Sequence, residues 1–260
     1  MSAHRRFVLE GLLKFISGNL PRKALLCVLL PLIGLSYFGT LAITAWLSPE
    51  AYDWRHKAIS KLLYPRNNPV LHSVASLGIA SAGLLMIPFA GYMRRRLRGV
   101  SPFGAATGAA AFASGALLLV LAGLIVSHPD RGTSAFPRLH EMLARGAAAA
   151  IGAGMLALWA CALKAYFTRS VTNSFQWSWL LGSWSLLTLP AILVIFLRLA
   201  TAAHFAWSNP VYLAIENPHV WHLGFWEWIG SAAVFLFLAS ATLFLPRHTR
   251  LRRAPRVPLQ

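Results

Sequence analysis

The stretch Ala24–Leu47, which reads ALLCVLLPLIGLSYFGTLAITAWL, contains no charged residue. A helix needs about 20 consecutive apolar residues to cross the roughly 30 Å hydrocarbon core of a bilayer. We therefore expect this stretch to form a transmembrane helix. It is too long for the apolar part of a signal peptide, and no small-x-small cleavage site follows it, so we interpret it as a retained first helix.

Five more stretches meet the same criterion. Together the predicted spans are 24–47, 71–93, 101–127, 139–163, 172–198 and 218–246. Hydrophobic residues make up 57% of the 260 residues and charged residues 12%, whereas a soluble domain carries about 25% charged residues. The sequence therefore predicts an all-α polytopic membrane protein. Its six-transmembrane-helix bundle forms one domain, 1–260, and ends in a basic tail at 247–260.

The basic residues lie between the apolar stretches. Of the 24 Lys and Arg, 16 fall on the side that would also carry both termini, which by the positive-inside rule places both termini in the cytoplasm. We expect a bacterial inner (cytoplasmic) membrane. A net charge of +17 would favour a nucleic-acid partner in a soluble protein, but here it orients helices, so no nucleic acid is expected. The expected partners are membrane lipids, with a protein subunit or a homo-oligomer as alternatives.

Three features predict how the helices pack. Gly104 and Gly108 form a GxxxG pattern, which lets helices approach closely in a compact bundle or in a dimer. Pro190 lies inside the fifth stretch and predicts a kink there. Three tryptophans near the predicted inner boundary are typical of an aromatic belt at the headgroups; they are Trp177, Trp179 and Trp184.

Polar side chains gather on the other side. Seven of the nine histidines and six of the seven acidic residues fall at or near the predicted outer face. Because basic residues crowd the predicted inner face, acidic residues are partly expected at the outer face. Histidine has no such topological bias, so its accumulation at the outer face leads us to expect a polar pocket there. Its candidate residues are His56, Ser60, His128, Asp130, His140, Glu141, Arg145 and Glu227.

Four of these positions, His140, Glu141, Arg145 and Glu227, lie within predicted spans. Glu141 and Arg145 are four residues apart, so they share a helix face and can form an ion pair. Glu227 lies inside the last span, where an ionisable residue is costly and is a candidate for function. A structural salt bridge between helices, with Arg145 or Arg198 as the partner of Glu227, is the alternative.

A metal site is a second interpretation of the histidines. His219 and His222 are three residues apart and, with His140, supply the ligand types that Zn²⁺ or another divalent metal prefers. A bis-histidine haem between His72 and His204 is a further alternative, and imidazoles placed at the headgroup boundary are the simplest one. No HExxH, GxSxG or P-loop motif is present, so the common hydrolase and NTPase classes are not indicated.

Three short motifs resemble a known family. They are Tyr52–Leu62 (YDWRHKAISKL), then His128-Pro129-Asp130 with Pro137–His140, and Phe225-Trp226-Glu227-Trp228. They resemble a six-helix prokaryotic membrane family of unknown function that is similar to the DRAM/FRAG/SFK membrane proteins. The resemblance implies a six-helix bundle with a link to lipids. It departs at Lys61, where the family usually has an acid after the serine.

The leading hypothesis is an accessory membrane protein that engages lipid or a partner subunit through the outer pocket. The alternative is a metal-dependent membrane enzyme, hydrolase-like, that acts on a lipid at the outer leaflet. A small transporter is a third reading, but the chain lacks the internal repeat that many transporters have.

Overall fold

The structure is a computed structural model that describes residues 10–11, 13–49, 51–125, 139–168, 174–203 and 223–246. Regular secondary structure in these ranges is entirely helical, which confirms the predicted all-α class for the described part of the chain. Five helices in it are long and apolar enough to cross a membrane. The length and composition of these helices therefore support a multi-pass membrane protein, but they do not confirm the predicted count of six spans.

The first long helix runs without a break over Arg22–Trp46. It contains two π-helical turns, and its segments are α2 (Arg22–Ala24), η1 (Leu25–Leu29), α3 (Leu30–Gly34), η2 (Leu35–Gly39) and α4 (Thr40–Trp46). Pro31 has no backbone N–H to donate to Cys27, and a wider turn just before it relieves the clash that a proline ring causes in a regular α-helix. The prediction 24–47 matches this helix closely.

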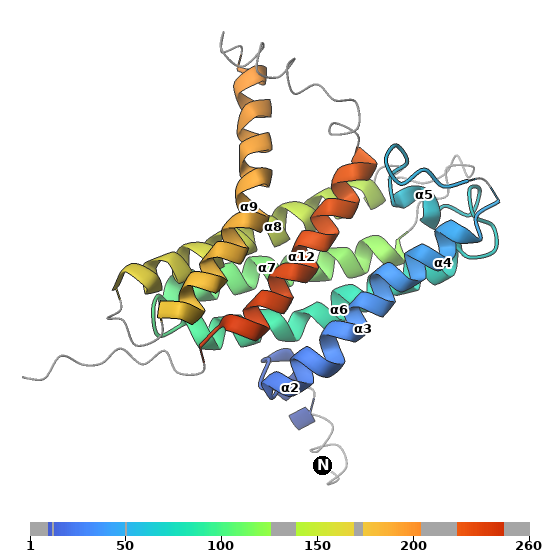
Figure 1. Cartoon of the computed structure of the whole chain (residues 1–260). Coiled ribbons are helices and arrows are strands. Elements are labelled where there is room, and N and C mark those ends of the chain that lie inside the picture. Colours follow the sequence, from blue (N-terminus) through green and yellow to red (C-terminus); the bar gives the residue numbers. More distant parts are fainter. Residues whose placement is uncertain are drawn as a thin grey trace, which may run out of the picture.

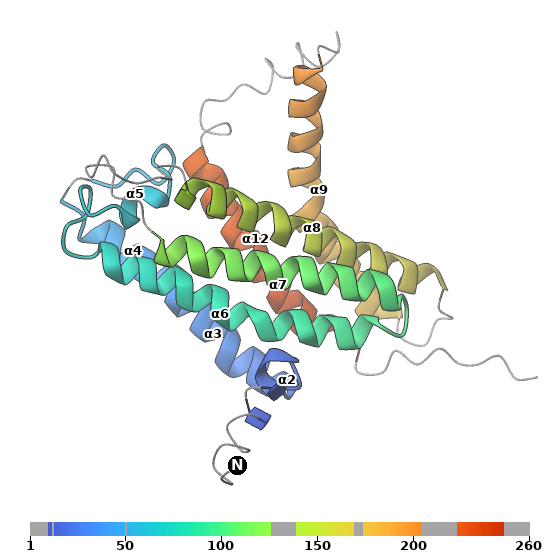
Figure 2. The ribbon, with the colours of Figure 1, turned by 180° about the vertical axis from the view of Figure 1, so that it is seen from behind.

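The remaining helices are α5 (Ser60–Leu63), α6 (His72–Leu97), α7 (Pro102–Leu124), α8 (Leu139–Thr168), α9 (Ser174–Ala202) and α12 (Leu223–Phe244). Figures 1 and 2 show α6, α7 and α8 side by side in one layer, with α12 and the first helix crossing one face of it. A short hairpin joins α6 to α7. Ser101 caps the start of α7, because its Oγ accepts a hydrogen bond from the Gly104 N–H at 3.3 Å, and Pro102 takes the first helical position.

Helix α9 corresponds to the fifth predicted span and covers 29 residues. Figure 1 shows that its ribbon changes direction near the middle and that its C-terminal half leads away from the other helices. Pro190 lies near the middle of this range, and a proline inside a helix is a common cause of such a bend. Helix α9 is not among the five candidate spans found in the described residues.

Small residues bring α7 and α8 into close contact. A Cβ at Gly108 would lie 3.0 Å from the Leu158 side chain, and one at Gly154 would lie 2.6 Å from the Phe112 backbone nitrogen. The GxxxG residue Gly104 similarly faces Cys161. The predicted close approach therefore operates between two helices of one chain.

The core lies where α12 and α9 cross the three-helix layer. Trp184 stacks on Phe237 with ring centroids 4.2 Å apart, and its Nε1 donates to Ser240 Oγ at 2.9 Å. Trp184 and Trp177 are buried. The predicted inner aromatic belt was therefore wrong for these two residues, whereas Trp179 is exposed.

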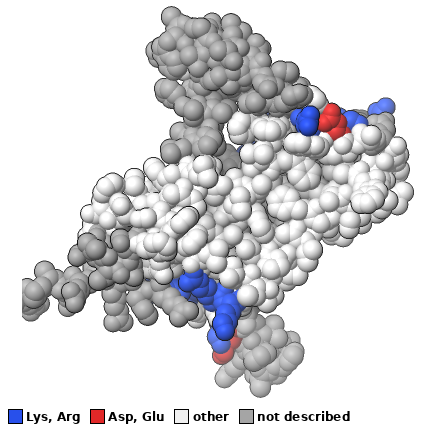
Figure 3. All heavy atoms as spheres, in the orientation of Figure 1, with Lys and Arg blue, Asp and Glu red and all other residues white. Residues whose placement is uncertain are grey.

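The first and last described segments lie at the same end of the bundle. The guanidinium of Arg95, near the end of α6, donates to the Gly18 carbonyl and the Asn19 side chain. Arg96 donates to the Pro246 carbonyl at 3.2 Å. On the face seen in Figure 3, charged side chains gather beside α2 and beside α5, and uncharged surface separates the two zones.

Candidate functional site

The loop 51–71 between α4 and α6, here called the cap loop, is folded onto one end of the bundle. It contains α5, and its apolar residues Ile59, Leu62 and Leu63 are buried against Leu41 of α4 and Ile79 of α6. Burial of several aliphatic side chains at about 1.5–3 kcal/mol each gives this segment its own stable packing. The cap loop is thus a structural element in its own right.

Glu227 of α12 fastens the cap loop to the bundle. Its Oε2 accepts a hydrogen bond from the backbone N–H of Ile59 at 2.5 Å. Ile59 directly precedes α5, and the backbone N–H groups at the start of a helix have no acceptor within that helix. A hydrogen bond to a charged acceptor contributes about 1.5–3 kcal/mol. Among the described residues, Glu227 therefore has a backbone partner, and Arg145, one of the two partners that the sequence suggested, pairs with Glu141 instead. The side chain of Arg198, the other suggested partner, lies outside the described residues.

Two neighbours of Glu227 on α12 hold the same loop. Trp228 Nε1 donates to the Tyr52 hydroxyl at 3.3 Å, and that hydroxyl donates to the Lys57 carbonyl at 2.8 Å. Burial raises the pKa of Tyr52 to about 12, and the nearby Glu227 adds to the rise while the bond from Trp228 opposes it. Gly224 packs directly on the loop, because a Cβ there would lie 2.4 Å from the Lys57 carbonyl oxygen.

A hydrogen-bonded chain joins α12 to the first helix beside this point. Ser231 Oγ donates to the Glu227 carbonyl at 2.6 Å, and the Tyr37 hydroxyl lies 2.7 Å from Ser231 Oγ. Because the single Ser231 proton goes to Glu227, Tyr37 is the donor in the second bond. The Phe38 ring stacks on Trp228. The base of the cap loop is thus fixed to two helices.

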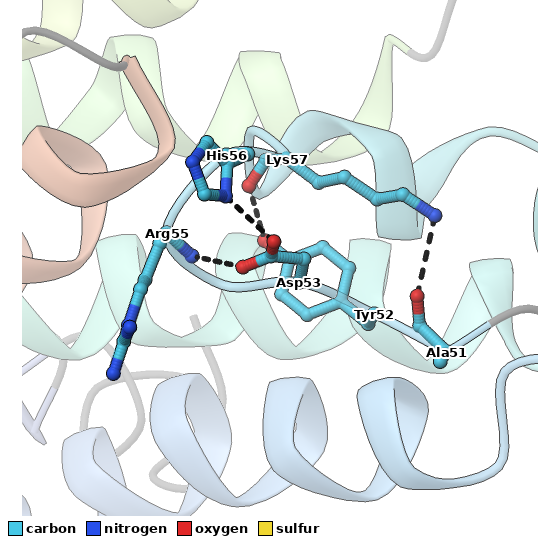
Figure 4. Close-up of polar contacts among 6 residues, drawn as sticks. All are labelled: Ala51, Tyr52, Asp53, Arg55, His56 and Lys57. Carbon is cyan, nitrogen blue, oxygen red and sulfur yellow. Dashed lines mark hydrogen bonds and ion pairs between the residues drawn. The ribbon is translucent and has the colours of Figure 1, made fainter. Parts of the chain in front are cut away.

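His56 and Asp53 form a separate, exposed pair within the cap loop. His56 Nδ1 lies 2.6 Å from Asp53 Oδ2, and the Arg55 backbone N–H donates to Asp53 Oδ1 at 3.0 Å (Figure 4). The hydrogen bond with His56, followed by that from Arg55, holds the pKa of Asp53 below its usual value. The guanidinium of Arg55 lies over the Trp54 ring, 5.3 Å from its centroid.

The start of α8 lies on another side of the cap loop. His140 is buried, its Nδ1 lies 2.8 Å from the Ala122 carbonyl of α7, and its ring meets the Tyr64 ring edge to face. Burial raises the pKa of Tyr64, and the charge of nearby Glu141 adds to the rise. Glu141 forms the ion pair with Arg145 that their spacing predicted, on an exposed face of α8.

The described candidate residues therefore share one end of the molecule but divide into three groups. Glu227 contacts the backbone directly before Ser60, His56 pairs with Asp53, and His140 binds a carbonyl on α7. Within the described ranges, no three His, Cys, Asp or Glu residues lie close enough to hold a metal ion. Four candidates fall outside those ranges: His128, Asp130, His219 and His222.

Sequence reasoning missed the residues that build the cap. Tyr52 and Trp228 were visible only as parts of two motifs, and Gly224 was not singled out. Their contacts join segments 168 to 176 residues apart and run partly through backbone atoms, which leave no pattern of side-chain types. The YDWRHKAISKL and FWEW segments were singled out as motifs in the sequence, and the structure places these two segments in contact.

Comparison of the chain with protein families, with curated proteins and with solved structures found no match to any of them.

Proposed function

We propose that the protein is an integral membrane protein with six spans, of which α9 is the fifth, in a bacterial inner membrane. Both termini are cytoplasmic, and the cap loop lies at the outer face. The support is the excess of Lys and Arg on the side of the termini, together with the position of Gly18 and Pro246 at one end of the bundle.

Labelling of introduced cysteines tests this orientation. On a Cys27→Ala, Cys161→Ala background, we expect a cysteine at position 56 to react with a membrane-impermeant maleimide in intact cells. A cysteine at position 164, near the end of α8 that lies away from the cap loop, should react only after the membrane is permeabilised. The reverse pattern would contradict the proposed orientation.

Within this topology, we propose an accessory, non-catalytic role in which the cap loop engages lipid at the outer leaflet. One observation supports this proposal most directly. The cap loop is packed against the bundle, yet its Trp54 side chain is 45% exposed and has the Arg55 guanidinium stacked over its ring. An aromatic ring beside a cation is the pairing that favours the headgroup boundary of a bilayer. Trp46 and Leu47, at the adjoining end of α4, are also exposed.

The polar candidates favour this role over catalysis. Glu227 and His140 each hold a specific structural partner, and a general base must instead reach a substrate. The resemblance to the DRAM/FRAG/SFK-like family remains part of the proposal, supported by the contact between two of its three motif segments. The metal-dependent enzyme stays a prediction that depends on His219 and His222, outside the described residues.

Photocrosslinking at position 54 tests the lipid role and separates it from a protein partner. With p-benzoylphenylalanine in place of Trp54, we expect irradiation of membranes to give an adduct whose added mass is that of a phospholipid. The same residue at position 46, which is 88% exposed on α4, is the positive control for lipid contact. An adduct to another protein, or none while position 46 reacts, would contradict the proposal.

A further inference from the structure

A small cavity opens between the end of α4 and the cap loop. Its volume is about 150 Å³, and it is lined by Ser48, Tyr52, Lys57, Lys61, Leu62 and Asn67. Because one water takes up about 30 Å³ in the liquid, the cavity has room for several waters or for one compact polar group. Two of its lining residues, Tyr52 and Lys57, also take part in the contacts that fix the cap loop to α12.

The lining of this cavity is suited to an anion. Among the described residues that line it, two are lysines and none is acidic, and each ammonium group offers three N–H donors. Ser48 adds a hydroxyl and Asn67 an amide. In Figure 4 the Lys57 side chain extends from the turn in the direction opposite to Arg55, and its Nζ lies 3.3 Å from the Ala51 carbonyl.

The walls of the cavity belong to the fixed part of the cap loop. Leu62, which belongs to α5, is 2% exposed, and Tyr52 is held between Trp228 and the Lys57 carbonyl. The Asn67 amide donates to the Lys61 carbonyl at 3.3 Å. The lysine backbones are therefore held in place before any ligand arrives, which lowers the entropy cost of binding.

The cavity also lies beside the surface expected to face lipid. Ser48 follows Trp46 and Leu47, which end the first span and are 88% and 61% exposed. The end of a transmembrane span lies where acyl chains give way to headgroups. The cavity that Lys57 and Lys61 line is therefore at the depth of a headgroup phosphate in this topology.

We propose that this cavity binds a phosphate group, with Lys57 and Lys61 as the cationic donors and Ser48 as a neutral donor. The phosphate comes either from the headgroup of an anionic phospholipid or from free phosphate. The proposal deepens the proposed function, because it supplies the chemistry by which the cap loop would choose its lipid.

Binding to the purified full-length protein in detergent tests the proposal, with three probes measured by native mass spectrometry. The probes are dihexanoyl phosphatidylglycerol, dihexanoyl phosphatidylcholine and inorganic phosphate. We expect the wild type to prefer phosphatidylglycerol over phosphatidylcholine and expect K57Q/K61Q to lower the phosphatidylglycerol affinity about tenfold, since charge-assisted hydrogen bonds are lost. K57R/K61R, which keeps both charges, should retain most of the binding.

The matched control is Lys164→Gln, which removes an exposed lysine from the far end of α8 and should leave binding unchanged. Competition by inorganic phosphate at equal concentration would assign the site to the free anion, and its failure to compete would assign the site to the lipid headgroup. Both results support a phosphate site. Unchanged binding in K57Q/K61Q, or an equal loss in Lys164→Gln, would overturn it.

Two further results keep the test specific. If the wild type binds none of the three probes, the proposal fails. If K57Q/K61Q binds as the wild type while position 54 still gives a phospholipid adduct, the phosphate site is overturned and the lipid role of the cap loop stands.

Discussion

A carboxylate inside an apolar helix usually indicates a functional group or an ion pair. In this chain Glu227 instead completes a backbone hydrogen bond at the start of α5, and Tyr52, Trp228 and Gly224 add contacts around it. At the scale of single residues, the cap loop therefore depends on a few atoms of α12. Substitutions at these atoms should affect the loop far more than equal substitutions one or two turns away.

Glu227→Ala should release the cap loop. The variant leaves the Ile59 N–H without its acceptor, which should cost about 1.5–3 kcal/mol. Hydrogen exchange read by mass spectrometry should then show faster exchange in residues 57–63. Glu227→Gln keeps an amide oxygen that can accept from Ile59, so it should lie between wild type and alanine. Equal protection in all three proteins would show that this bond does not hold the loop.

Gly224→Ala should push the cap loop away from α12. The new Cβ would lie 2.4 Å from the Lys57 carbonyl oxygen, and relief of such overpacking typically costs about 1–3 kcal/mol. Gly230→Ala on the same helix is the control, since nothing lies within 4 Å of its Cβ. We expect a lower thermal unfolding midpoint for Gly224→Ala alone; similar midpoints for the two variants would speak against the close contact.

The Asp53 turn should loosen in acid. Because the pKa of folded Asp53 is lowered from 3.8, its stabilising contribution is fully present above pH 3.8 and is lost as the pH falls through the lowered pKa. A spin label at position 56 would remove the pairing histidine, so the label belongs at position 54. Its mobility should rise below pH 3.8 in the parent and show no such step in Asp53→Asn.

At the scale of helices, hydropathy predicted the long elements to within a few residues. The predicted 139–163 became Leu139–Thr168, and 71–93 became His72–Leu97; both extend because a helix continues past the apolar core through its basic end. Which face of a helix is buried was not predictable, because lipid and protein core are equally apolar. Trp184 shows this, since it fitted a boundary residue by sequence and lies in the core.

The contact between α7 and α8 gives a prediction about this packing. Gly154→Ala would place a Cβ 2.6 Å from the Phe112 backbone nitrogen, whereas Gly152→Ala meets nothing within 4 Å. We expect the first to lower the free energy of unfolding by about 1–3 kcal/mol and the second to leave it unchanged or slightly higher, because alanine favours helix. Unfolding in detergent, followed by circular dichroism, compares them; equal effects would contradict the α7–α8 packing.

At the scale of the whole molecule, the sequence predicted an apolar helical bundle with polar groups gathered at one end. It did not predict how those groups divide. Contacts such as Glu227 to Ile59 join residues 168 positions apart through a backbone N–H, which no residue pattern encodes. The predicted single pocket is thus represented, among the described residues, by three groups with separate partners around a folded loop.

The central claim is that the cap loop is held at the lipid boundary of the bundle. The depth of a nitroxide at position 54, in lipid nanodiscs and on a Cys27→Ala, Cys161→Ala background, tests it most directly. The account predicts a depth at the headgroup level, between an oxygen-accessible label at position 46 and a water-accessible label at position 56. A label at position 54 that is as accessible to a water-soluble relaxant as the label at position 56 would contradict it.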